Sequence, residues 1–261
     1  MGGYPGWFAA SPAVTMAPMT TSEPIVSATD LRRTYGDGEA AVHALAGVSV
    51  DLPAGGFTAV MGRSGSGKST LLHLLAGLDR STSGSITIDG TGLDGLDDAA
   101  LTRLRRDRLG FVFQAFNLVP VLDARENILL PFTLAGREPD SAWFDQLVAA
   151  VGLEDRLGHR PAELSGGQQQ RVAVARALVH RPAVVFADEP TGNLDSGSAA
   201  EVLGLLRRAV DDFGQTVVIV THDAAAAAYA DRVIVLADGL TVRDVEAGGV
   251  EEVLELMKAV S

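Results

Sequence analysis

The chain has 261 residues, of which 47% are hydrophobic and 21% are charged, a balance typical of a folded globular protein with a sizeable core. Its formal net charge of −12 argues against a general nucleic-acid-binding protein, which needs a basic surface, so we expect no nucleic-acid partner. The absence of cysteine excludes disulfides and thiolate metal sites. No uncharged apolar run reaches about eighteen residues and no basic residue precedes an apolar leader, so we expect no direct membrane insertion and a cytoplasmic location.

The N-terminal segment differs from the rest of the chain. Residues 1–23 are rich in Gly, Pro, Ala, Ser and Thr and lack helical or strand periodicity, which predicts a disordered tail. After this tail, apolar segments bounded by turn residues predict strands at Ile25–Tyr35, Val42–Leu52 and Phe57–Met61.

The third predicted strand leads into a glycine-rich segment with the pattern G-x-x-x-x-G-K-S. Its residues are Gly62, Arg63, Ser64, Gly65, Ser66, Gly67, Lys68, Ser69 and Thr70, and the leucines that follow predict a helix over 67–78. The glycines let backbone amides close around an oligophosphate. Lys68 can place its charge between the β- and γ-phosphates, and the Ser69 hydroxyl can ligate Mg²⁺. The alternative is a glycine-rich turn without a ligand, which a second element downstream has to exclude.

The middle of the chain changes from α/β to helical texture. The predicted elements here are a strand at Ser85–Asp89, a charged amphipathic helix at Ala99–Arg108 and an apolar strand at Gly110–Gln114. From Ala124 to Leu157 the pattern is helical, with expected breaks at Pro131, Gly136 and Gly152. We interpret this region as a helical insertion.

Alternating helices and strands then resume. The predicted elements are helix Gly166–His180, strand Ala183–Ala187, helix Ser198–Phe213, strand Thr216–Val220, helix Ala224–Tyr229 and strand Arg232–Ala237. The uninterrupted apolar runs Val184–Phe186 and Val217–Val220 are typical of strands buried on both faces of a parallel sheet. A short acidic helix is expected over Gly248–Ala259.

Two adjacent carboxylates follow one of these buried strands. Ligands of α/β sheets bind at the carboxyl ends of the strands, so Asp188 should lie near the phosphate loop and hold Mg²⁺ directly or through water. Glu189 can reach beyond the γ-phosphate to orient and polarise the attacking water. An acidic pair on the surface is the alternative.

The segment Leu164–Arg171 reads L-S-G-G-Q-Q-Q-R. Ser165 with Gln168 three residues later can form a capping box, which would explain the segment as a plain helix start. Gly166 and Gly167 are costly in the first turn of such a helix, but they suit a site where the phosphate of another molecule approaches the amides.

Together with the phosphate loop and Asp188-Glu189, this L-S-G-G-Q signature closely resembles the ATP-binding cassette (ABC) ATPases, over about Ile25 to Asp244. The resemblance implies an α/β P-loop NTPase fold, with a RecA-like core containing a mixed sheet, an N-terminal antiparallel β region and a helical subdomain of about residues 115–165 inserted after the Q-loop. It also implies one ATPase domain over 24–245 and a short C-terminal helix within 246–261.

The resemblance assigns roles to further residues. Tyr35 resembles the aromatic residue that stacks on adenine, although a strand aromatic packing inward is an alternative. Gln114 resembles the Q-loop glutamine, whose amide touches Mg²⁺ or the water. Asp195 resembles the D-loop aspartate at the dimer interface, with a plain helix N-cap as its alternative. His222 resembles the switch histidine that hydrogen-bonds the γ-phosphate.

The predicted site therefore has three groups of residues. The catalytic residues are Glu189, His222 and Gln114. The Mg²⁺ ligands are Ser69, Gln114 and Asp188. The ATP-binding residues are Tyr35, Gly62, Ser64, Gly65, Ser66, Gly67, Lys68, Ser69, Thr70, Ser165, Gly166, Gly167, Gln168 and Asp195. The remaining histidines receive no role, namely His43, His73, His159 and His180.

In this family the signature of one subunit faces the phosphate loop of another. The resemblance therefore implies a head-to-tail homodimer that traps two ATP molecules and is released by hydrolysis. Such an ATPase powers a separate integral membrane permease subunit, which would dock on the helical insertion around Gln114–Gly136. The chain would then lie peripherally at the inner face of the cell membrane.

Finer features resemble one subgroup, the ATPase subunits of lipoprotein release, macrolide-type export and cell division. The segments that carry this likeness are Gly110–Leu118, Glu126-Asn127, Gln168–Arg171 and Asp188–Asp195. The subgroup acts by export or by mechanotransmission. A non-transport ABC ATPase that regulates a cell-division or other assembly is the alternative. Arg63 departs from the family pattern, in which a proline is common at this position.

Overall fold

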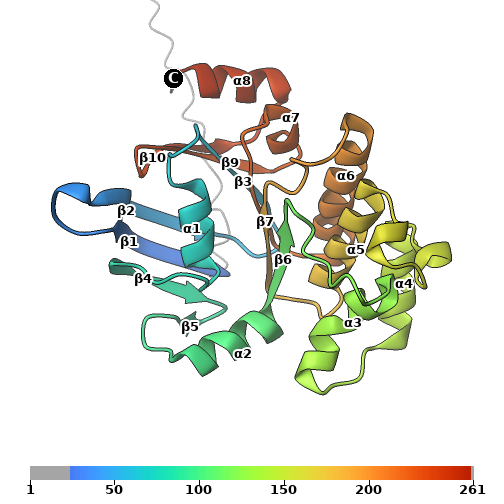
Figure 1. Cartoon of the computed structure of the whole chain (residues 1–261). Helices are drawn as coiled ribbons and strands as arrows, with labels where there is room; N and C mark the ends of the chain where they lie inside the picture. Colours follow the sequence, from blue (N-terminus) through green and yellow to red (C-terminus); the bar gives the residue numbers. More distant parts are fainter. Residues whose placement is uncertain (1–23, 260–261) are drawn as a thin grey trace, which may run out of the picture.

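The computed structural model describes residues 24–259. The tail predicted over 1–23 and the last two residues of the predicted C-terminal segment lie outside the described residues. The described chain forms two β-sheets with helices packed between and around them (Figure 1).

The first sheet is antiparallel and contains the N-terminal strands. Its strand order is β2 (Val42–Leu52), β1 (Val26–Tyr35), β4 (Ser83–Ile88) and β5 (Thr91–Gly92). β1 and β2 pair with Thr34 opposite His43 and Tyr35 opposite Val42. This sheet confirms the predicted N-terminal antiparallel region.

The second sheet is mixed and carries the site. Its strand order is β10 (Leu240–Glu246), β9 (Arg232–Ala237), β3 (Phe57–Met61), β8 (Val217–Val220), β7 (Val184–Asp188) and β6 (Leu109–Phe113). Neighbouring strands from β9 to β6 are parallel, whereas β10 is antiparallel to β9. The strand β10 is not among the predicted elements, because Arg243 and Asp244 interrupt its apolar pattern, as the charged residues of an edge strand do.

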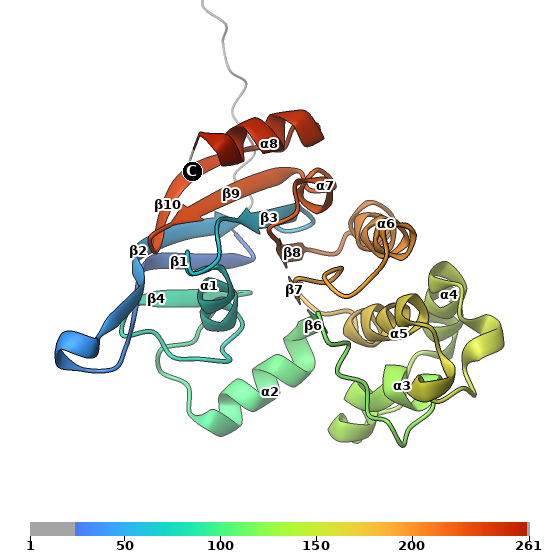
Figure 2. The same cartoon turned by 45° about the horizontal axis from the view of Figure 1, so that its top comes forward.

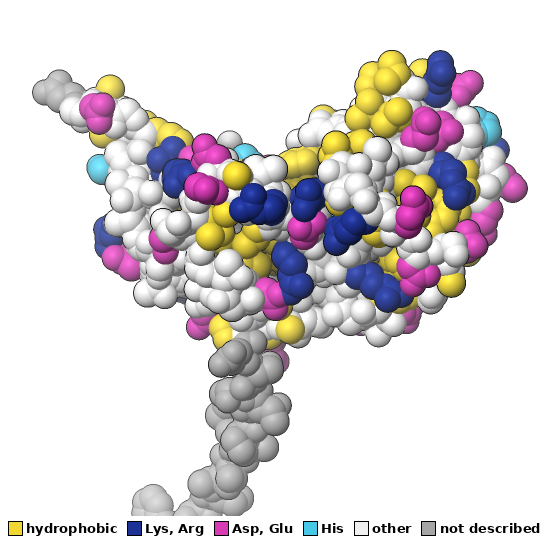
Figure 3. Space-filling model, turned by 90° about the horizontal axis from the view of Figure 1, so that it is seen from below, with side chains coloured by type: hydrophobic (Ala, Val, Ile, Leu, Met, Phe, Trp, Pro, Cys, Tyr) yellow, Lys and Arg dark blue, Asp and Glu magenta, His cyan; other side chains and the backbone are white. Residues whose placement is uncertain are grey.

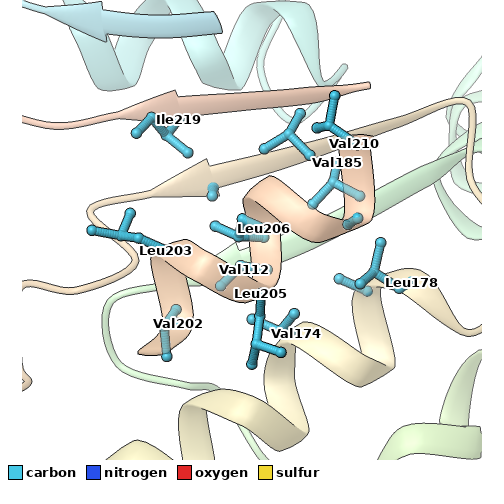
Figure 4. Packing of buried hydrophobic residues seen from close by; sticks show 14 of the residues in the cluster. Val112, Val174, Leu178, Val185, Val202, Leu203, Leu205, Leu206, Val210 and Ile219 are labelled. Atoms are coloured by element: carbon cyan, nitrogen blue, oxygen red, sulfur yellow. The ribbon is translucent and has the colours of Figure 1, made fainter. Parts of the chain in front are cut away.

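Alternate residues of the parallel strands point into two separate cores. Val184 and Phe186 of β7 pack in the core that contains α1 (Lys68–Leu75) and the antiparallel sheet. Val185 and Ala187 pack in the core that contains α5 (Gly166–Leu178) and α6 (Ser196–Phe213). Figure 2 shows these helices on opposite sides of the sheet, and Figure 4 shows the packing in the second core. The predicted burial of the sheet on both faces is therefore confirmed.

The helical region consists of α2 (Asp98–Arg108) before β6 and of α3 (Ala124–Ala135) and α4 (Ser141–Val151) after it. Gly136 and Gly152 end α3 and α4 in the left-handed conformation, with φ of 61° and 62°, as expected. The break expected at Pro131 is wrong, because α3 continues through it. Proline removes a single helical hydrogen bond, and the fully buried Asn127 and Ile128 anchor the turn before it.

The chain ends in short helices. The last two are α7 (Ala224–Ala227), which follows β8, and α8 (Val250–Lys258), which follows β10. Val253 is fully buried and attaches α8 to the domain, as the apolar residues of the predicted C-terminal helix indicate. Short 3₁₀ turns complete the described elements at Gly38–Ala40, Glu154–Arg156 and Pro161–Glu163.

Alanine substitutions at two glycines are expected to change the stability of the protein in opposite directions. A Cβ at Gly110 of β6 would lie 2.4 Å from the carbonyl oxygen of Ala177 in α5, whereas a Cβ at Gly204 of α6 would meet no atom within 4 Å. Gly110→Ala should lower the free energy of unfolding by about 1–3 kcal/mol through overpacking. Gly204→Ala, the matched control, should raise it by about 0.5–1 kcal/mol because alanine loses less entropy in a helix. Denaturant unfolding of both variants checks this pair, and equal effects would contradict it.

Candidate functional site

A cavity of about 580 Å³ lies at the carboxyl ends of the parallel strands. It brings together residues from β2, from the phosphate loop and from the segments after β7 and β8. Its lining consists of Val42, His43, Ala44, Ser64, Gly65, Gly67, Lys68, Ser69, Thr70, Glu189 and His222. Most of the predicted phosphate-binding residues and two of the predicted catalytic residues thus share one cavity, while Gly62 and Ser66 line a neighbouring hollow on another side of the loop.

The phosphate loop connects β3 to α1 and has a fixed backbone shape. Gly67 has a φ of 100°, and a Cβ there would lie 2.4 Å from the carbonyl oxygen of Ala44, so only glycine fits. No side chain caps the N-terminus of α1, which leaves its first amides available to an anion. Lys68 donates hydrogen bonds of 2.9 Å to the carbonyl oxygens of Gly62 and Arg63. The loop therefore holds both amide donors and a cation at the cavity.

The Lys68 ammonium is buried at the inner end of the loop. Burial lowers its pKa, although the carboxylates of Glu189 and Asp188 act in the opposite direction. An anion in the cavity, such as the phosphates of a nucleotide, would stabilise the charged form of Lys68 and offset the cost of its burial.

Asp188 ends β7 beside the first turn of α1. The Ser69 hydroxyl donates to Asp188 Oδ1 at 3.3 Å, and His73 Nε2 lies 3.8 Å from Oδ2. Burial is the main cause that raises the pKa of the Asp188 carboxyl. A nearby cation would stabilise the ionised form of this buried carboxyl. The hydroxyl of Ser69 and the carboxylate of Asp188 are both oxygen ligands of the kind that Mg²⁺ prefers.

The donor set around Asp188 also suits Mg²⁺ in number. Among residues 24–259, no three or more His, Cys, Asp or Glu residues gather in a geometry that could hold a metal ion. Mg²⁺ is usually bound through one or two protein oxygens together with substrate phosphates and water, so it does not need such a cluster.

Glu189 and His222 form a pair at the ends of adjacent strands. His222 Nδ1 lies 2.8 Å from Glu189 Oε1, and the Glu189 amide donates to the carbonyl oxygen of Val220 at 2.9 Å. The histidine side chain is 73% exposed and the glutamate side chain 20%. Glu189 has a φ of 46°, a left-handed conformation that is strained for a residue with a side chain. Such strain is typical of functional positions, and it aims this carboxylate into the cavity.

Gln114 lies against the predicted D-loop, Gly192–Asp195, and does not line the cavity described above. Its Nε2 donates to Asn193 Oδ1 at 3.1 Å, and Asn193 Nδ2 donates to the carbonyl oxygen of Gln114 at 3.0 Å. A Cβ on Gly192 would lie 2.8 Å from Gln114 Nε2. These contacts connect the end of β6 to the segment after Glu189.

Asp195 caps α6. Its carboxylate accepts hydrogen bonds from the amides of Gly197 and Ser198 and from the Ser198 hydroxyl, at 2.8–3.0 Å. These bonds lower the pKa of the carboxyl. The geometry of the N-cap alternative is thus present, and a role of Asp195 at a dimer interface stays a prediction.

The signature Ser165–Gln168 opens α5 on the other side of the sheet from α1 (Figure 2). Both bonds of the capping box are present, at 3.3 Å and 2.9 Å. A Cβ on Gly167 would lie 2.8 Å from Ser198 Oγ, so packing accounts for this glycine. A Cβ on Gly166 would make only ordinary contacts, so packing does not require glycine there. Within the described chain the signature does not line the cavity that contains its own phosphate loop.

Tyr35 lies at the end of β1, opposite Val42 of the cavity lining. Its hydroxyl donates to Asp79 Oδ2 at 2.8 Å, and the Arg33 guanidinium lies 4.4 Å from the ring centre. Tyr35 is 40% exposed and is not part of the cavity lining described above. Stacking of Tyr35 on a base therefore stays a prediction.

Sequence reasoning missed the three consecutive cavity residues of β2, Val42, His43 and Ala44. Their sequence has no catalytic pattern. The only available signal was the place of this strand in the N-terminal antiparallel β region that the resemblance implies. His73 was also missed, because its proximity to Asp188 depends on how α1 packs beside β7.

Comparisons with known proteins agree on one family. The family model described as ABC transporter matches residues 45–192. The macrolide export ATP-binding/permease protein MacB of Marinobacter nauticus is 47% identical to this chain over 223 residues, and MacB of Escherichia coli K12 is 46% identical over 223 residues. Each match covers 85% of this chain and 34% of the relative. The chain therefore spans about a third of the length of these curated relatives.

Solved structures of similar fold are ATP-binding cassettes. The dimeric post-hydrolysis state of the cassette MJ0796, bound to ADP and Pi, has a TM-score of 0.77 and 41% identity and covers 86% of this chain and 99% of its own. The cbiO1 subunit of the Clostridium perfringens cbiONQ complex has a TM-score of 0.77 and 29% identity, and the match covers 90% of this chain and 92% of cbiO1.

Because the pKa of Asp188 is raised, we expect that replacing its carboxylate by a neutral group stabilises the folded protein. Because its pKa in the folded state is above the unfolded value, the ionised carboxylate costs stability at neutral pH, and this cost disappears as the pH falls below the ordinary aspartate pKa. Asp188→Asn should therefore melt at a higher temperature than the parent at pH 7 without divalent cations, and the gain should shrink as the solution is acidified. Melting curves of both proteins in EDTA across pH check this, with the exposed Asp145→Asn as control. A gain that grows on acidification would contradict it.

Proposed function

The chain belongs to the ABC transporter family, and from this premise we propose that it hydrolyses Mg·ATP between two copies of itself to drive a membrane partner. The observation that carries the proposal is the single cavity in which the phosphate loop meets the Glu189–His222 pair. A phosphate-binding cradle beside a carboxylate that can accept a proton is suited to attack of water on a terminal phosphate.

The lining of the cavity favours one orientation of a bound ATP molecule. The amides of the phosphate loop and the N-terminus of α1 would hold the phosphates, with Lys68 placed between the last two. The γ-phosphate would then point to Glu189 and His222, and the nucleoside would extend over β2. This orientation puts each predicted group at the part of ATP that it can bind.

Mg²⁺ would be held by the Ser69 hydroxyl and Asp188, together with phosphate oxygens. When bound, it supplies positive charge that stabilises the charge developing on the transferred phosphoryl group. Gln114 is next to Asn193 in the described chain, so its amide would reach the metal or the water only with movement of this segment.

Glu189 is proposed to act as the general base. Its carboxylate would accept a proton from a water molecule, while the left-handed backbone and the bond to the Val220 carbonyl hold its direction. With the carboxylate ionised, His222 Nδ1–H donates to Oε1 and thereby fixes the carboxylate rotamer. With ATP bound, the exposed histidine could turn to the γ-phosphate, as the family resemblance implies.

The site would be completed by a second copy of the chain. The signature of the described chain lies across the sheet from its own loop, and the relatives of solved structure include a dimeric cassette bound to ADP and Pi. We propose that Ser165–Gln168 and Asp195 of one copy close the cavity of the other in a head-to-tail homodimer. Gly166, which packing does not require, leaves room for a phosphate from the facing copy.

The proposed membrane partner would dock in a second cavity of about 370 Å³ between α2, β6 and α3. Leu78, Phe111 and Leu134 give it apolar surface, and Arg105, Arg106 and Arg176 lie among them. Figure 3 shows a face of the molecule on which Lys and Arg side chains lie between apolar ones. An amphipathic segment of a permease would fit this groove. Gln114 directly follows Phe113, the last residue of β6 and part of the groove lining, so it would connect the groove to the site.

The curated relatives are ATP-binding/permease proteins for macrolide export, which supports export as the action of the complete assembly. None of the helices in residues 24–259 has the length and apolarity that crossing a membrane requires. We propose a peripheral location at the inner face of the membrane, through the permease.

Glu189→Gln tests the chemistry. This variant should bind Mg·ATP but hydrolyse it at least about a hundredfold more slowly than the parent, because the general base is lost. With ATP it should run as a dimer on size exclusion. Lys68→Ala should lose ATP binding, and the exposed Glu138→Gln should behave as the parent. Unchanged turnover in Glu189→Gln would refute its role as the base. A persistent monomer at saturating ATP would refute dimerisation of the isolated chain.

Leu134→Asp tests the docking groove. Leu134 is 68% exposed and lines the groove, whereas Val121 is 70% exposed and lies outside its lining. In a pull-down from detergent-solubilised native cells with Mg·ATP, the Glu189→Gln protein should recover a membrane protein. Adding Leu134→Asp should reduce this recovery about tenfold or more, as desolvating a carboxylate in an apolar interface does, whereas Val121→Asp should not. Recovery of soluble partners only would favour a regulator of an assembly over a transporter subunit.

A further inference from the structure

The proposed docking groove is rich in positive charge, although the whole chain has a formal net charge of −12. Arg105, Arg106 and Arg176 line it, and none of its described lining residues is acidic. Asp107 lies beside the groove and accepts two hydrogen bonds of 2.9 Å from Arg106 and one of 3.0 Å from Arg137. Among residues 24–259, it is the only carboxylate that forms an ion pair with any of these four guanidinium groups.

Two of the cations in the groove have neutral partners. Arg176 of α5 donates to the carbonyl oxygens of Asn117 at 2.6 Å and of Phe116 at 2.9 Å. Burial lowers the pKa of this guanidinium. Arg105 of α2 donates to the carbonyl oxygen of Gly77 at 2.6 Å and to a threonine hydroxyl at 3.0 Å. An anion beside Arg176 would offset the cost of burying its charge, and a carboxylate matches the planar geometry of a guanidinium.

Between these cations the groove is apolar and concave. Its lining includes Phe111, Leu130, Pro131 and Leu134, and its volume is about 370 Å³. A hollow of this kind takes up single side chains that project from a helix. The surface of a lipid bilayer, which is flat on this scale, would leave the hollow unfilled. The shape of the groove therefore favours a protein segment over lipid headgroups, and its charge favours an acidic one.

We propose that the docking segment of the membrane partner is an acidic amphipathic helix, one Asp or Glu of which binds the Arg176 guanidinium while its apolar side chains fill the hollow. The inference rests on the proposed function, since it assumes a permease in this groove. A basic or neutral segment would leave the buried cation without a counter-charge, so the groove would select among permeases. Arg176 also holds the backbone at Phe116 and Asn117, so the ion pair would form next to the segment that follows Gln114.

Crosslinking of the captured complex tests this contact. Carbodiimide joins an amine to a carboxylate in direct contact, and Arg176→Lys places an amine in the groove. The chain has only two native lysines, Lys68 and Lys258, so few other crosslinks compete. The Glu189→Gln protein with Arg176→Lys is captured from detergent-solubilised native cells with Mg·ATP, crosslinked and digested. We expect mass spectrometry to show position 176 joined to an Asp or Glu of the membrane protein, within a segment that has apolar residues at helical spacing.

Arg181→Lys in the same Glu189→Gln protein is the matched control. Arg181 follows α5, its side chain is 60% exposed, and it lies outside the groove lining. The carboxylate of Asp140 is 3.8 Å from its guanidinium. An amine at position 181 should therefore crosslink to Asp140 of the same chain and not to the membrane protein.

A synthetic peptide of the crosslinked segment measures what the carboxylate contributes. In calorimetry, replacing its Asp or Glu by the corresponding amide should weaken binding to the parent chain about tenfold or more, as the loss of a charge-assisted hydrogen bond does. Both peptides should bind Arg176→Gln with equal affinity, because the cation that distinguishes them is gone. A merely structural role of Arg176 would weaken both peptides and preserve the difference between them.

Failure of the proposed function and failure of this inference give different results. If no membrane protein is recovered, the proposed function fails. If the membrane protein is recovered and the link from position 181 to Asp140 forms, but position 176 joins no carboxylate of such a segment, only the acidic contact is overturned. Flotation of the parent with phosphatidylglycerol vesicles that is lost in Arg176→Gln, without a crosslink to protein, would overturn it in favour of anionic lipid.

Discussion

The phosphate loop is confined between two backbone carbonyls that come from distant parts of the chain. A Cβ on Gly62 would lie 2.3 Å from the carbonyl oxygen of Leu236 in β9, and a Cβ on Gly67 would lie 2.4 Å from that of Ala44 in β2. The loop can take its shape only because both residues lack a side chain. Its amides and Lys68 are consequently directed by the packing of the antiparallel sheet and of β9. The rest of the site is arranged around this fixed cradle.

Several groups at the cavity are held in states that cost stability. Glu189 adopts a left-handed backbone, and burial raises the pKa of Asp188 and lowers the pKa of Lys68. A nucleotide with its metal ion would compensate the buried charges, because phosphates face the lysine and the cation faces the carboxylate. The proposed ligand would thus offset the cost of burying these charges, and its binding would stabilise the fold by linkage.

The proposed docking groove and the site share one strand. Phe111 and Phe113 of β6 line the groove, and Gln114, the next residue, is held by Asn193 of the predicted D-loop. Movement of a partner in the groove would therefore act on the segment that follows Glu189. The fully buried Gln170 of α5 reinforces this connection, since its Nε2 donates to the carbonyl oxygens of Phe113 and Pro190. Coupling between membrane partner and chemistry would run through these short polar contacts.

The sequence by itself determined the fold class and the composition of the cavity's phosphate end. Local pattern was sufficient there, because strand, loop and helix are contiguous from Phe57 to Leu75, and the apolar runs of β7 and β8 indicate a sheet buried on both faces. Pattern failed at Pro131, where tertiary contacts keep α3 intact, and at β10, whose charged residues belong to an edge strand. Only the tertiary structure decided that His43 lines the cavity and that Gln114 faces Asn193. These placements depend on strand pairing and sheet order, which join residues far apart in the chain and leave no local trace in the sequence.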